Sequence, residues 1–306
     1  MKLSIWGRAM ALGSLLLASS WTQALTFAVN EGVTYRVGND EIRARYAAIS
    51  ADLSKLLGQP VRVEPIGDYN TLRKGLADKA YDLAIVHPAH ISIGAMKNNG
   101  YQLVAVTKGF ENYRAAFMVR ADAPFKNLAE LRGKKVGAPD EDSITSWMVR
   151  ATLRDALGDP KAVAYTYTRY QDAVPFMVEN TFTQVGASAS NAIVKQWEAG
   201  GGKVIARSKP VPIKHVIASP TLSREMVDKV RDYLTALDGS EAGRKKLEPI
   251  KIQGYAAYDG AALLNLGAWL GLWNDGRTAA APANATAQAP AAPATPAAAA
   301  TQTAGL

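Results

Sequence analysis

The residue types best suited to bind a small ligand lie together in one short segment, Pro139-Asp-Glu-Asp-Ser-Ile-Thr-Ser146. The sequence pattern predicts a strand over 135–138 before it and an amphipathic helix over 143–157 after it. Hydroxyl groups and free backbone N–H groups at a helix N-terminus suit a small oxyanion, because the helix dipole is positive there. Asp, Ser and Thr are also ordinary N-cap residues, so the segment predicts either an anion site or a plain helix cap. Its hydroxyl side chains are those of Ser143, Thr145 and Ser146.

Two histidines, His87 and His90, follow a predicted strand over 83–86. The carboxyl ends of strands in α/β sheets commonly carry ligand-contacting residues, and two imidazoles at this spacing could share a metal ion. No third metal ligand is evident, so the favoured interpretation is that one histidine caps the strand end and the other lies on the following helix. The third histidine, His215, lies in an apolar segment and is expected to be structural.

Catalytic motifs are absent. The sequence contains no Gly-x-x-x-x-Gly-Lys-Ser/Thr loop, no Gly-x-Gly-x-x-Gly and no His-Glu-x-x-His. The run from Gly186 to Ser190 resembles a nucleophile elbow, but Ser190 replaces the second glycine that the sharp turn requires. We therefore expect neither enzyme activity nor a cofactor.

Composition excludes further classes of protein. The 306 residues include no cysteine, which rules out a disulfide scaffold or a Cys-ligated zinc site. The net charge of +8 could suggest nucleic acid, since phosphate contacts dominate such binding. The basic clusters at 132–135 and 244–246 are not interleaved with aromatic residues, so no nucleic-acid partner is expected. The positive field should instead steer anionic ligands weakly.

Both ends of the chain differ in composition from the rest. Residues 1–24 have the features of a secretory signal peptide: Lys2 and Arg8, a short apolar run, and small residues ending at Ala24. The apolar run is too short to span a bilayer, so we expect cleavage after Ala24 and a periplasmic mature protein. The Ala/Pro/Thr-rich tail at 278–306 is expected to be disordered.

Alternating strands and helices over 25–277 must position the candidate residues. Strand, helix, strand at this spacing predicts an α/β fold with right-handed crossovers between parallel strands. The pattern restarts after 116, and the segments following 218 are helical with no new strand series. We therefore expect two lobes, 25–115 plus 214–277 and 116–213. Two crossing segments, near 113–119 and 212–218, would form the hinge.

Three segments resemble the substrate-binding proteins of phosphate, phosphite and phosphonate ABC importers. They are the run from Tyr69 to His90 with its Asp82-Leu-Ala-Ile-Val, the run Leu131-Arg-Gly-Lys-Lys-Val-Gly-Ala, and Asp142-Ser-Ile-Thr-Ser146. The resemblance covers about residues 25–260. It implies a type II periplasmic binding fold, with a mostly parallel sheet in each lobe. The lobes would close on a ligand, and a membrane permease would recognise the closed form.

The resemblance also assigns site residues. Tyr69 and His87 would contact the ligand from the first lobe, and Ser143 and Thr145 would hold its oxygens from the second. Four further candidate ligand contacts depart from the family pattern, which leaves the ligand class open between a small oxyanion and a polar organic molecule. These are Ser146 where the family has Gly, Gln171 where it commonly has His, Gln184 where it commonly has Asp, and Asn30 where it often has Pro.

The leading hypothesis is a monomeric periplasmic solute-binding component of an ABC importer that captures a small oxyanion or phosphonate-like ligand. One alternative keeps the fold but makes the protein a sensor partner of a membrane receptor. Another is an exported metal-binding protein that uses His87 and His90.

Overall fold

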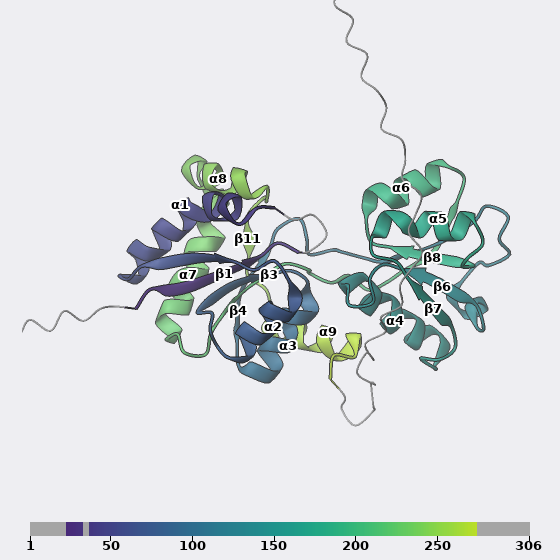
Figure 1. Cartoon of the computed structure of the whole chain (residues 1–306), viewed down its shortest axis with the longest axis horizontal. Helices are drawn as coiled ribbons and strands as arrows, with labels where there is room; N and C mark the ends of the chain where they lie inside the picture. Colours follow the sequence, from purple (N-terminus) through teal and green to yellow (C-terminus); the bar gives the residue numbers. More distant parts are fainter. Residues whose placement is uncertain (1–22, 33–36, 274–306) are drawn as a thin grey trace, which may run out of the picture. The chain divides into compact units, whose positions relative to one another are not determined.

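Two mixed β-sheets flanked by helices make up the described part of the chain (Figure 1). The structure is a computed structural model that describes residues 23–32 and 37–273. The predicted signal peptide, apart from Gln23 and Ala24, and the predicted tail at 278–306 lie outside the described residues. In the described ranges, no helix has the length and apolar character needed to cross a membrane.

The first sheet has the strand order β11-β4-β10-β3-β1-β2. Parallel pairing joins β1 to β2 and β3, whereas β10 pairs antiparallel with β3 and β4. Its strands are β1 (Leu25–Asn30), β2 (Val61–Pro65), β3 (Leu83–Val86), β4 (Gln102–Thr107), β10 (His215–Ala218) and β11 (Tyr255–Ala256).

Helices cover both faces of the first sheet, because successive strand residues point to opposite faces. Phe27 and Val29 pack with α1, α7 and α8 on one face, whereas Ala28 packs with α2 and α3 on the other. The helices are α1 (Asn39–Leu57), α2 (Tyr69–Ala77), α3 (Ala89–Asn99), α7 (Arg224–Ala236), α8 (Glu241–Leu247) and α9 (Gly260–Leu270), with 3-10 turns η3 (Leu237–Gly239) and η4 (Glu248–Ile250).

The second sheet has the order β7-β6-β8-β5-β9. Phe117 and Val119 point into a cluster with α4, and Ala116 and Met118 into another with α5 and α6. Its strands are β5 (Ala116–Val119), β6 (Lys135–Ala138), β7 (Ala164–Tyr167), β8 (Val185–Ser188) and β9 (Lys203–Arg207). Its helices are α4 (Ile144–Leu157), α5 (Val174–Glu179) and α6 (Asn191–Ala199), with 3-10 turns η1 (Leu128–Leu131) and η2 (Gln171–Ala173).

The two-lobed α/β fold is confirmed, and the strand pairing refines the expectation of mostly parallel sheets. In the first sheet β1 to β4 run one way and β10 and β11 the other; in the second, only β5 opposes the rest. The antiparallel strands β5 and β10 are those that continue the two crossing segments, and each enters the interior of its sheet. The ladders are therefore mixed although most strands share a direction.

The two crossing segments run antiparallel and are hydrogen-bonded to each other. Val211 N–H donates to the carbonyl of Tyr113 at 3.0 Å, and Ile213 N–H donates to that of Phe110 at 3.2 Å. Farther along, Thr107 N–H donates to the carbonyl of Lys214 at 3.0 Å. The backbones of the two segments are thereby held together.

The C-terminal region differs from the sequence expectation in one respect. It contributes a short strand, β11, in which Tyr255 pairs with Thr107 at the edge of the first sheet. Two residues are too few to give a periodic pattern, so no strand was expected after 218. Helix α9 then packs Leu263 and Leu270 in a core cluster that includes residues of α3 and α4.

Candidate ligand-binding site

Residues that follow strands of both sheets line one cavity of about 480 Å³. Four of the predicted site residues contribute to it, namely Tyr69, His87, Ser143 and Gln171. A second hollow of about 410 Å³ beside α5 and α6 contains none of the predicted residues. The other residues that line the first cavity are Glu31, Gly32, Phe110, Tyr113, Pro139, Asp140, Arg169, Tyr170, Asp172, Ser190, Ile193, Ile213 and Lys214.

The three hydroxyls of the 139–146 segment have different roles. Ser143 is the N-cap of α4: its Oγ accepts from the backbone N–H of Ser146 at 3.1 Å, and the residue lines the cavity. Ser146 is fully buried, and its hydroxyl donates to the carbonyl of Pro139 at 2.9 Å. Thr145 is 1% exposed, and its hydroxyl lies 3.3 Å from that of Tyr113. Ser143 therefore faces the cavity, whereas Thr145 and Ser146 hold the loop in shape.

His87 lines the cavity as a neutral ring. Its Nδ1–H donates to the carbonyl of Ile213, on the second crossing segment, at 3.1 Å. Because a carbonyl can only accept, this contact assigns the proton to Nδ1 and leaves Nε2 as an acceptor. Burial lowers the pKa of His87 to about 4, so the ring carries no charge at neutral pH.

Tyr69 reaches the cavity from the first turn of α2. The carboxylate of Asp68 caps this helix by accepting from the backbone N–H of Thr71 at 2.8 Å. The guanidinium of Arg73, one turn along, lies 6.0 Å from the centre of the Tyr69 ring. The capped turn thereby fixes the point at which the phenol enters the cavity.

Gln171 lines the cavity with an amide that is largely engaged. Its Oε1 accepts from the hydroxyl of Ser188 at 2.9 Å and from the N–H of Ala189 at 2.7 Å. Its Nε2 donates to the hydroxyl of Tyr113 at 2.9 Å. Tyr113, which the sequence did not single out, therefore connects Gln171 with Thr145.

Asn30 and Gln184 do not line this cavity. Asn30 is fully buried; its Nδ2 donates to the carbonyl of Ile66 at 2.7 Å and its Oδ1 accepts from Gly32 N–H at 3.2 Å. Gln184 lies just before β8, where its Oε1 accepts from Lys135 N–H at 2.9 Å and the residue lines a different hollow. The cavity lies beyond the other end of β8, which explains the separation of Gln184 from it.

Charged side chains also line the cavity. The sequence did not indicate them, because Gln171 and Gln184 stand where the family commonly has His and Asp. Lys214 is half-buried, and its ammonium lies 4.1 Å from the centre of the Phe110 ring. Arg169 is exposed and lies 5.1 Å from the centre of the Tyr170 ring. The placement of Lys214 within a predicted crossing segment was the available signal, because such segments border the cleft. The carboxylates on the cavity wall are Glu31, Asp140 and Asp172.

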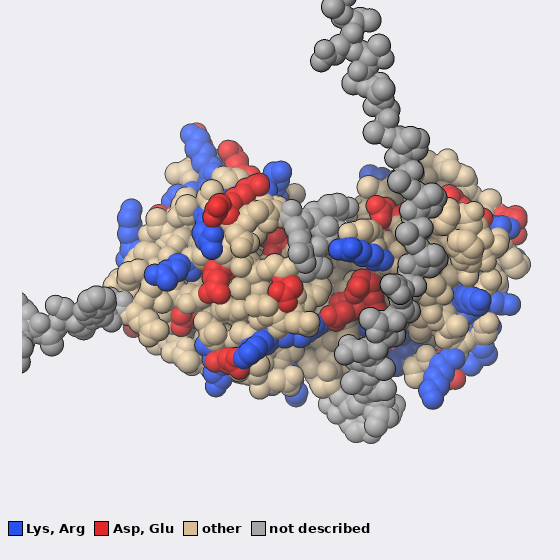
Figure 2. Space-filling model, in the orientation of Figure 1, with Lys and Arg blue, Asp and Glu red and all other residues tan. Residues whose placement is uncertain are grey.

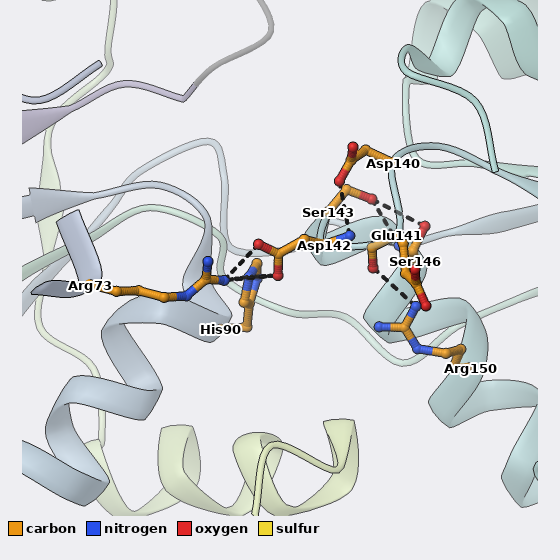
Figure 3. A network of polar contacts seen from close by, with 8 residues as sticks. All are labelled: Arg73, His90, Asp140, Glu141, Asp142, Ser143, Ser146 and Arg150. Carbon is orange, nitrogen blue, oxygen red and sulfur yellow. Dashed lines mark hydrogen bonds and ion pairs between the residues drawn. The ribbon is translucent and has the colours of Figure 1, made fainter. Parts of the chain in front are cut away.

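An ion pair joins the two lobes beside the cavity (Figure 3). Nη2 of Arg73, on α2, lies 2.8 and 2.7 Å from the two carboxylate oxygens of Asp142, in the loop before α4. His90 Nε2, on α3, lies 3.2 Å from both Arg73 Nη2 and Asp142 Oδ1. Figure 3 shows the carboxylate of Asp142 pointing toward Arg73 and His90, while Ser143 and Asp140 lie on the other side of the loop. We refer to these three residues as the interlobe bridge.

The contacts within the interlobe bridge shift the pKa values of Asp142 and His90. Burial alone would raise the pKa of the Asp142 carboxyl, but His90 and Arg73 outweigh it and lower the pKa to about 2. Burial lowers the pKa of His90, which favours a neutral ring. In that state the Nε2–H donates to the carboxylate, and Nδ1 has no hydrogen-bond partner among the described residues.

The two histidines of the metal hypothesis do not face a common site. His87 bonds to a carbonyl and lines the cavity, whereas His90 is buried against Asp142 and the ring of Trp147, with ring centres 5.8 Å apart. Within 23–32 and 37–273, no group of three or more His, Cys, Asp or Glu side chains is placed to hold a metal ion.

The buried histidine His215 has the structural role expected of it. Its Nε2–H donates to the carbonyl of Pro212 at 3.0 Å, and its Nδ1 lies 2.6 Å from the hydroxyl of Ser92, which also donates to the carbonyl of Ala89 at 2.8 Å. This contact fastens β10 to α3 behind the cavity.

On the face seen in Figure 2, basic and acidic side chains are interspersed rather than gathered into a patch of one sign.

The sequence of this chain matches a known protein family. Residues 32–263 match a family described as "ABC transporter, phosphonate, periplasmic substrate-binding protein". No match is found among the curated proteins.

Solved structures share the fold at low sequence identity. XAC2383 from Xanthomonas citri bound to ATP has a TM-score of 0.64 and 14% identity, over 81% of this chain and 96% of that one. PhnD1 from Prochlorococcus marinus in complex with methylphosphonate has a TM-score of 0.56 and 15% identity, over 81% and 97%. A binding protein component of an ABC phosphonate transporter from Pseudomonas aeruginosa has a TM-score of 0.54 and 18% identity, over 80% and 85%.

Proposed function

Because the chain belongs to the periplasmic substrate-binding protein family of phosphonate ABC transporters, we propose that it captures a phosphonate-like oxyanion in the described cavity and delivers it to a membrane permease. Residues 32–263, which match the family, include every residue of the cavity wall except Glu31.

One observation carries the proposal: a single cavity collects Tyr69 and His87 from the first lobe and Ser143 and Gln171 from the second. A ligand that contacts both sets stabilises the closed arrangement of the lobes by its differential affinity for that state. This is the behaviour a permease needs in order to distinguish loaded from empty protein.

The chemistry of the cavity wall suits an oxyanion. Ser143 and Tyr69 bring hydroxyl groups to the wall. The hydroxyl of Ser143 donates to Oγ of Ser146 at 3.2 Å, so it must turn to donate to an oxyanion. Ser143 also lies at the positive end of the fourteen-residue helix α4. We place Thr145 and Ser146 behind this wall as supports and assign no ligand contact to Asn30 or Gln184. His87 contributes a neutral ring, so it supplies hydrogen-bonding capacity without positive charge.

The remaining parts of the proposal follow from the same family membership and from the sequence of the first 24 residues. The mature protein would act as a monomer in the periplasm, after removal of the signal peptide. It would have no catalytic role. Its lobes would be residues 25–115 with 214–277, and residues 116–213.

The test is thermal unfolding of residues 25–306 with methylphosphonate, inorganic phosphate, ATP and methanesulfonate, followed by titration calorimetry. A ligand at 100 times its dissociation constant should add about 2.7 kcal/mol of stability. Ser143→Ala should weaken binding of the stabilising anion by about tenfold, since it removes a hydrogen bond to a charged group.

The matched control is Ser223→Ala. Ser223 also caps a helix, α7, by accepting from the N–H of Met226 at 3.2 Å, but it does not line the cavity. Both variants should lose about 1 kcal/mol of stability as lost caps, whereas only Ser143→Ala should lose affinity. Equal affinities in the two variants, or no stabilisation by any of the anions, would contradict the proposal.

A further inference from the structure

Lys214 is a half-buried cation on the wall of the cavity. Its ammonium group makes no ion pair within 4.0 Å among the described residues. The undescribed segment 33–36 reads Val-Thr-Tyr-Arg and carries no carboxylate. A cation removed from water in this way is unfavourable unless a counter-charge reaches it.

The carboxylate of Glu31 acts on Lys214, but it is already engaged by other residues. An oxygen of Glu31 lies 3.0 Å from the guanidinium of Arg45, and its other oxygen accepts from the hydroxyl of Tyr46 at 3.1 Å. Burial lowers the pKa of Lys214 despite the opposing effect of Glu31, so the carboxylate compensates it only in part. The ammonium group of Lys214 is thus only partly compensated by a carboxylate, although carboxylates also line the cavity.

The position of Lys214 is fixed by the backbone and by an aromatic ring. Its carbonyl accepts from Thr107 N–H at 3.0 Å, and its ammonium lies 4.1 Å from the centre of the Phe110 ring. Lys214 lies on the second crossing segment and Phe110 just before the first, and the carbonyl of Phe110 accepts from Ile213 N–H at 3.2 Å. The charge is therefore held in place before any ligand arrives, which lowers the ordering entropy lost on binding.

Other charges border the same cavity but are placed differently. Arg169, Asp140 and Asp172 are exposed, so water screens them, whereas Lys214 is half-buried and interacts with an anion in a lower dielectric. Neutral His87 adds no charge. Among the cavity's cations, Lys214 is thus the better placed to attract an anion inside it.

We propose that Lys214 recognises the negative charge of the ligand. The ligand would bind with its anionic group at the crossing segments, against the ammonium group of Lys214 and beside the ring of Phe110. This inference rests on the proposed function, because it names the group that recognises the oxyanion. It also explains why a cation without a carboxylate partner lies within a cavity wall.

The test compares Lys214→Met, Lys214→Arg and the wild-type protein by calorimetric titration with methylphosphonate. Lys214→Met, which keeps most of the side-chain volume, should weaken binding by about 10- to 100-fold, the usual effect of losing a charged hydrogen-bond partner. Lys214→Arg should recover part of the loss. The wild-type affinity should fall with added salt, and this dependence should diminish in Lys214→Met. The matched control is Lys195→Met, since Lys195 is exposed on α6 and does not line the cavity.

A second readout separates recognition from a structural role. Because the charge is partly desolvated without an ion pair, Lys214→Met should unfold at the same temperature as the wild type, or a higher one, when no ligand is present. Unchanged methylphosphonate affinity in Lys214→Met would overturn the inference while leaving the proposed function intact. A lower unliganded melting temperature with an unchanged salt dependence would overturn it as well. If the wild-type protein binds none of the anions, both proposals fall.

Discussion

Gly32 lies against the imidazole of His87 at the edge of the cavity. Its φ angle is 107°, in a region that residues with side chains rarely adopt. A Cβ added at this position would lie 2.8 Å from Cδ2 of His87, inside normal contact distance. The close approach of backbone and ring therefore depends on the absence of a side chain.

We expect Gly32→Ala to destabilise the protein by about 1–3 kcal/mol and to weaken anion binding, because both the backbone and the His87 ring must shift. Urea unfolding and methylphosphonate titration measure the two effects. Gly94→Ala is the control: Gly94 lies within α3 with no atom within 4 Å of the added Cβ, so this change should stabilise by about 0.5–1 kcal/mol. A Gly32→Ala variant as stable as the wild type would show that the ring moves freely.

At the level of secondary-structure elements, His215 lies buried where β10 contacts α3, and its burial makes the folding stability depend on pH. Burial lowers the pKa of His215 to about 3, against an ordinary value near 6.5, and the ring is neutral in the folded state. Below pH 6.5 the unfolded chain binds a proton that the folded chain does not, so folding stability falls as the pH decreases.

At pH 4.5 this effect amounts to about 2–3 kcal/mol for His215, and His87, with a pKa of about 4, adds to it. His215→Gln keeps an acceptor for Ser92 and a donor for Pro212 but does not titrate. Urea unfolding gives the free energy of unfolding at pH 7 and at pH 4.5. The loss of this free energy between the two pH values should be about 2 kcal/mol smaller in the variant than in the wild type. The Asp142 carboxyl, with a pKa of about 2, remains ionised at both pH values and does not confuse the comparison. The same pH dependence in both proteins would be evidence against a neutral, buried His215.

Most elements were predictable because their local patterns are strong. The predicted strands over 83–86 and 135–138 coincide with β3 and β6, since short buried apolar runs end at polar or Gly-containing turns. The two-residue β11 was missed because its neighbours in the sheet, rather than its own sequence, define it.

The candidate site was predictable only where one segment carries the signal. Ser143 was identified by its position at a helix start, and Tyr69 and His87 by a family-like run. The interlobe bridge was missed because Arg73 and Asp142 are 69 residues apart, and no local pattern connects them. Lys214 was missed because its place in a predicted crossing segment does not by itself tell whether the side chain faces solvent or the cavity.

For the whole molecule, the interlobe bridge bears on how firmly the lobes stay together. Arg73 and Asp142 each retain 39% side-chain exposure, so water screens the pair and its contribution should not exceed about 1 kcal/mol. We expect Asp142→Asn to weaken methylphosphonate binding by up to about fivefold and to shift the unliganded protein toward more open conformations. Calorimetry gives the first effect and small-angle X-ray scattering the second.

The double variant Arg73→Asp/Asp142→Arg restores opposite charges and should recover part of the affinity. Asp122→Asn is the matched control, since Asp122 forms a similar 2.7 Å pair with Arg120 within the second lobe. An affinity loss in the control as large as that in Asp142→Asn would assign the effect to net charge instead of to the bridge.

The packing of α9 limits how the two lobes can move. Its Leu263 and Leu270 share an apolar cluster with residues of α3 and α4, and its Trp269 carbonyl accepts from Arg154 of α4 at 2.6 Å. This contact adds to the two hydrogen-bonded crossing segments and to the interlobe bridge, which also connect the lobes. Translation of one lobe away from the other would expose the leucines to water, whereas rotation about the line of attachments would not. Separation by translation should therefore cost more free energy than a rotation that keeps these contacts, and ligand binding has only the smaller cost to overcome.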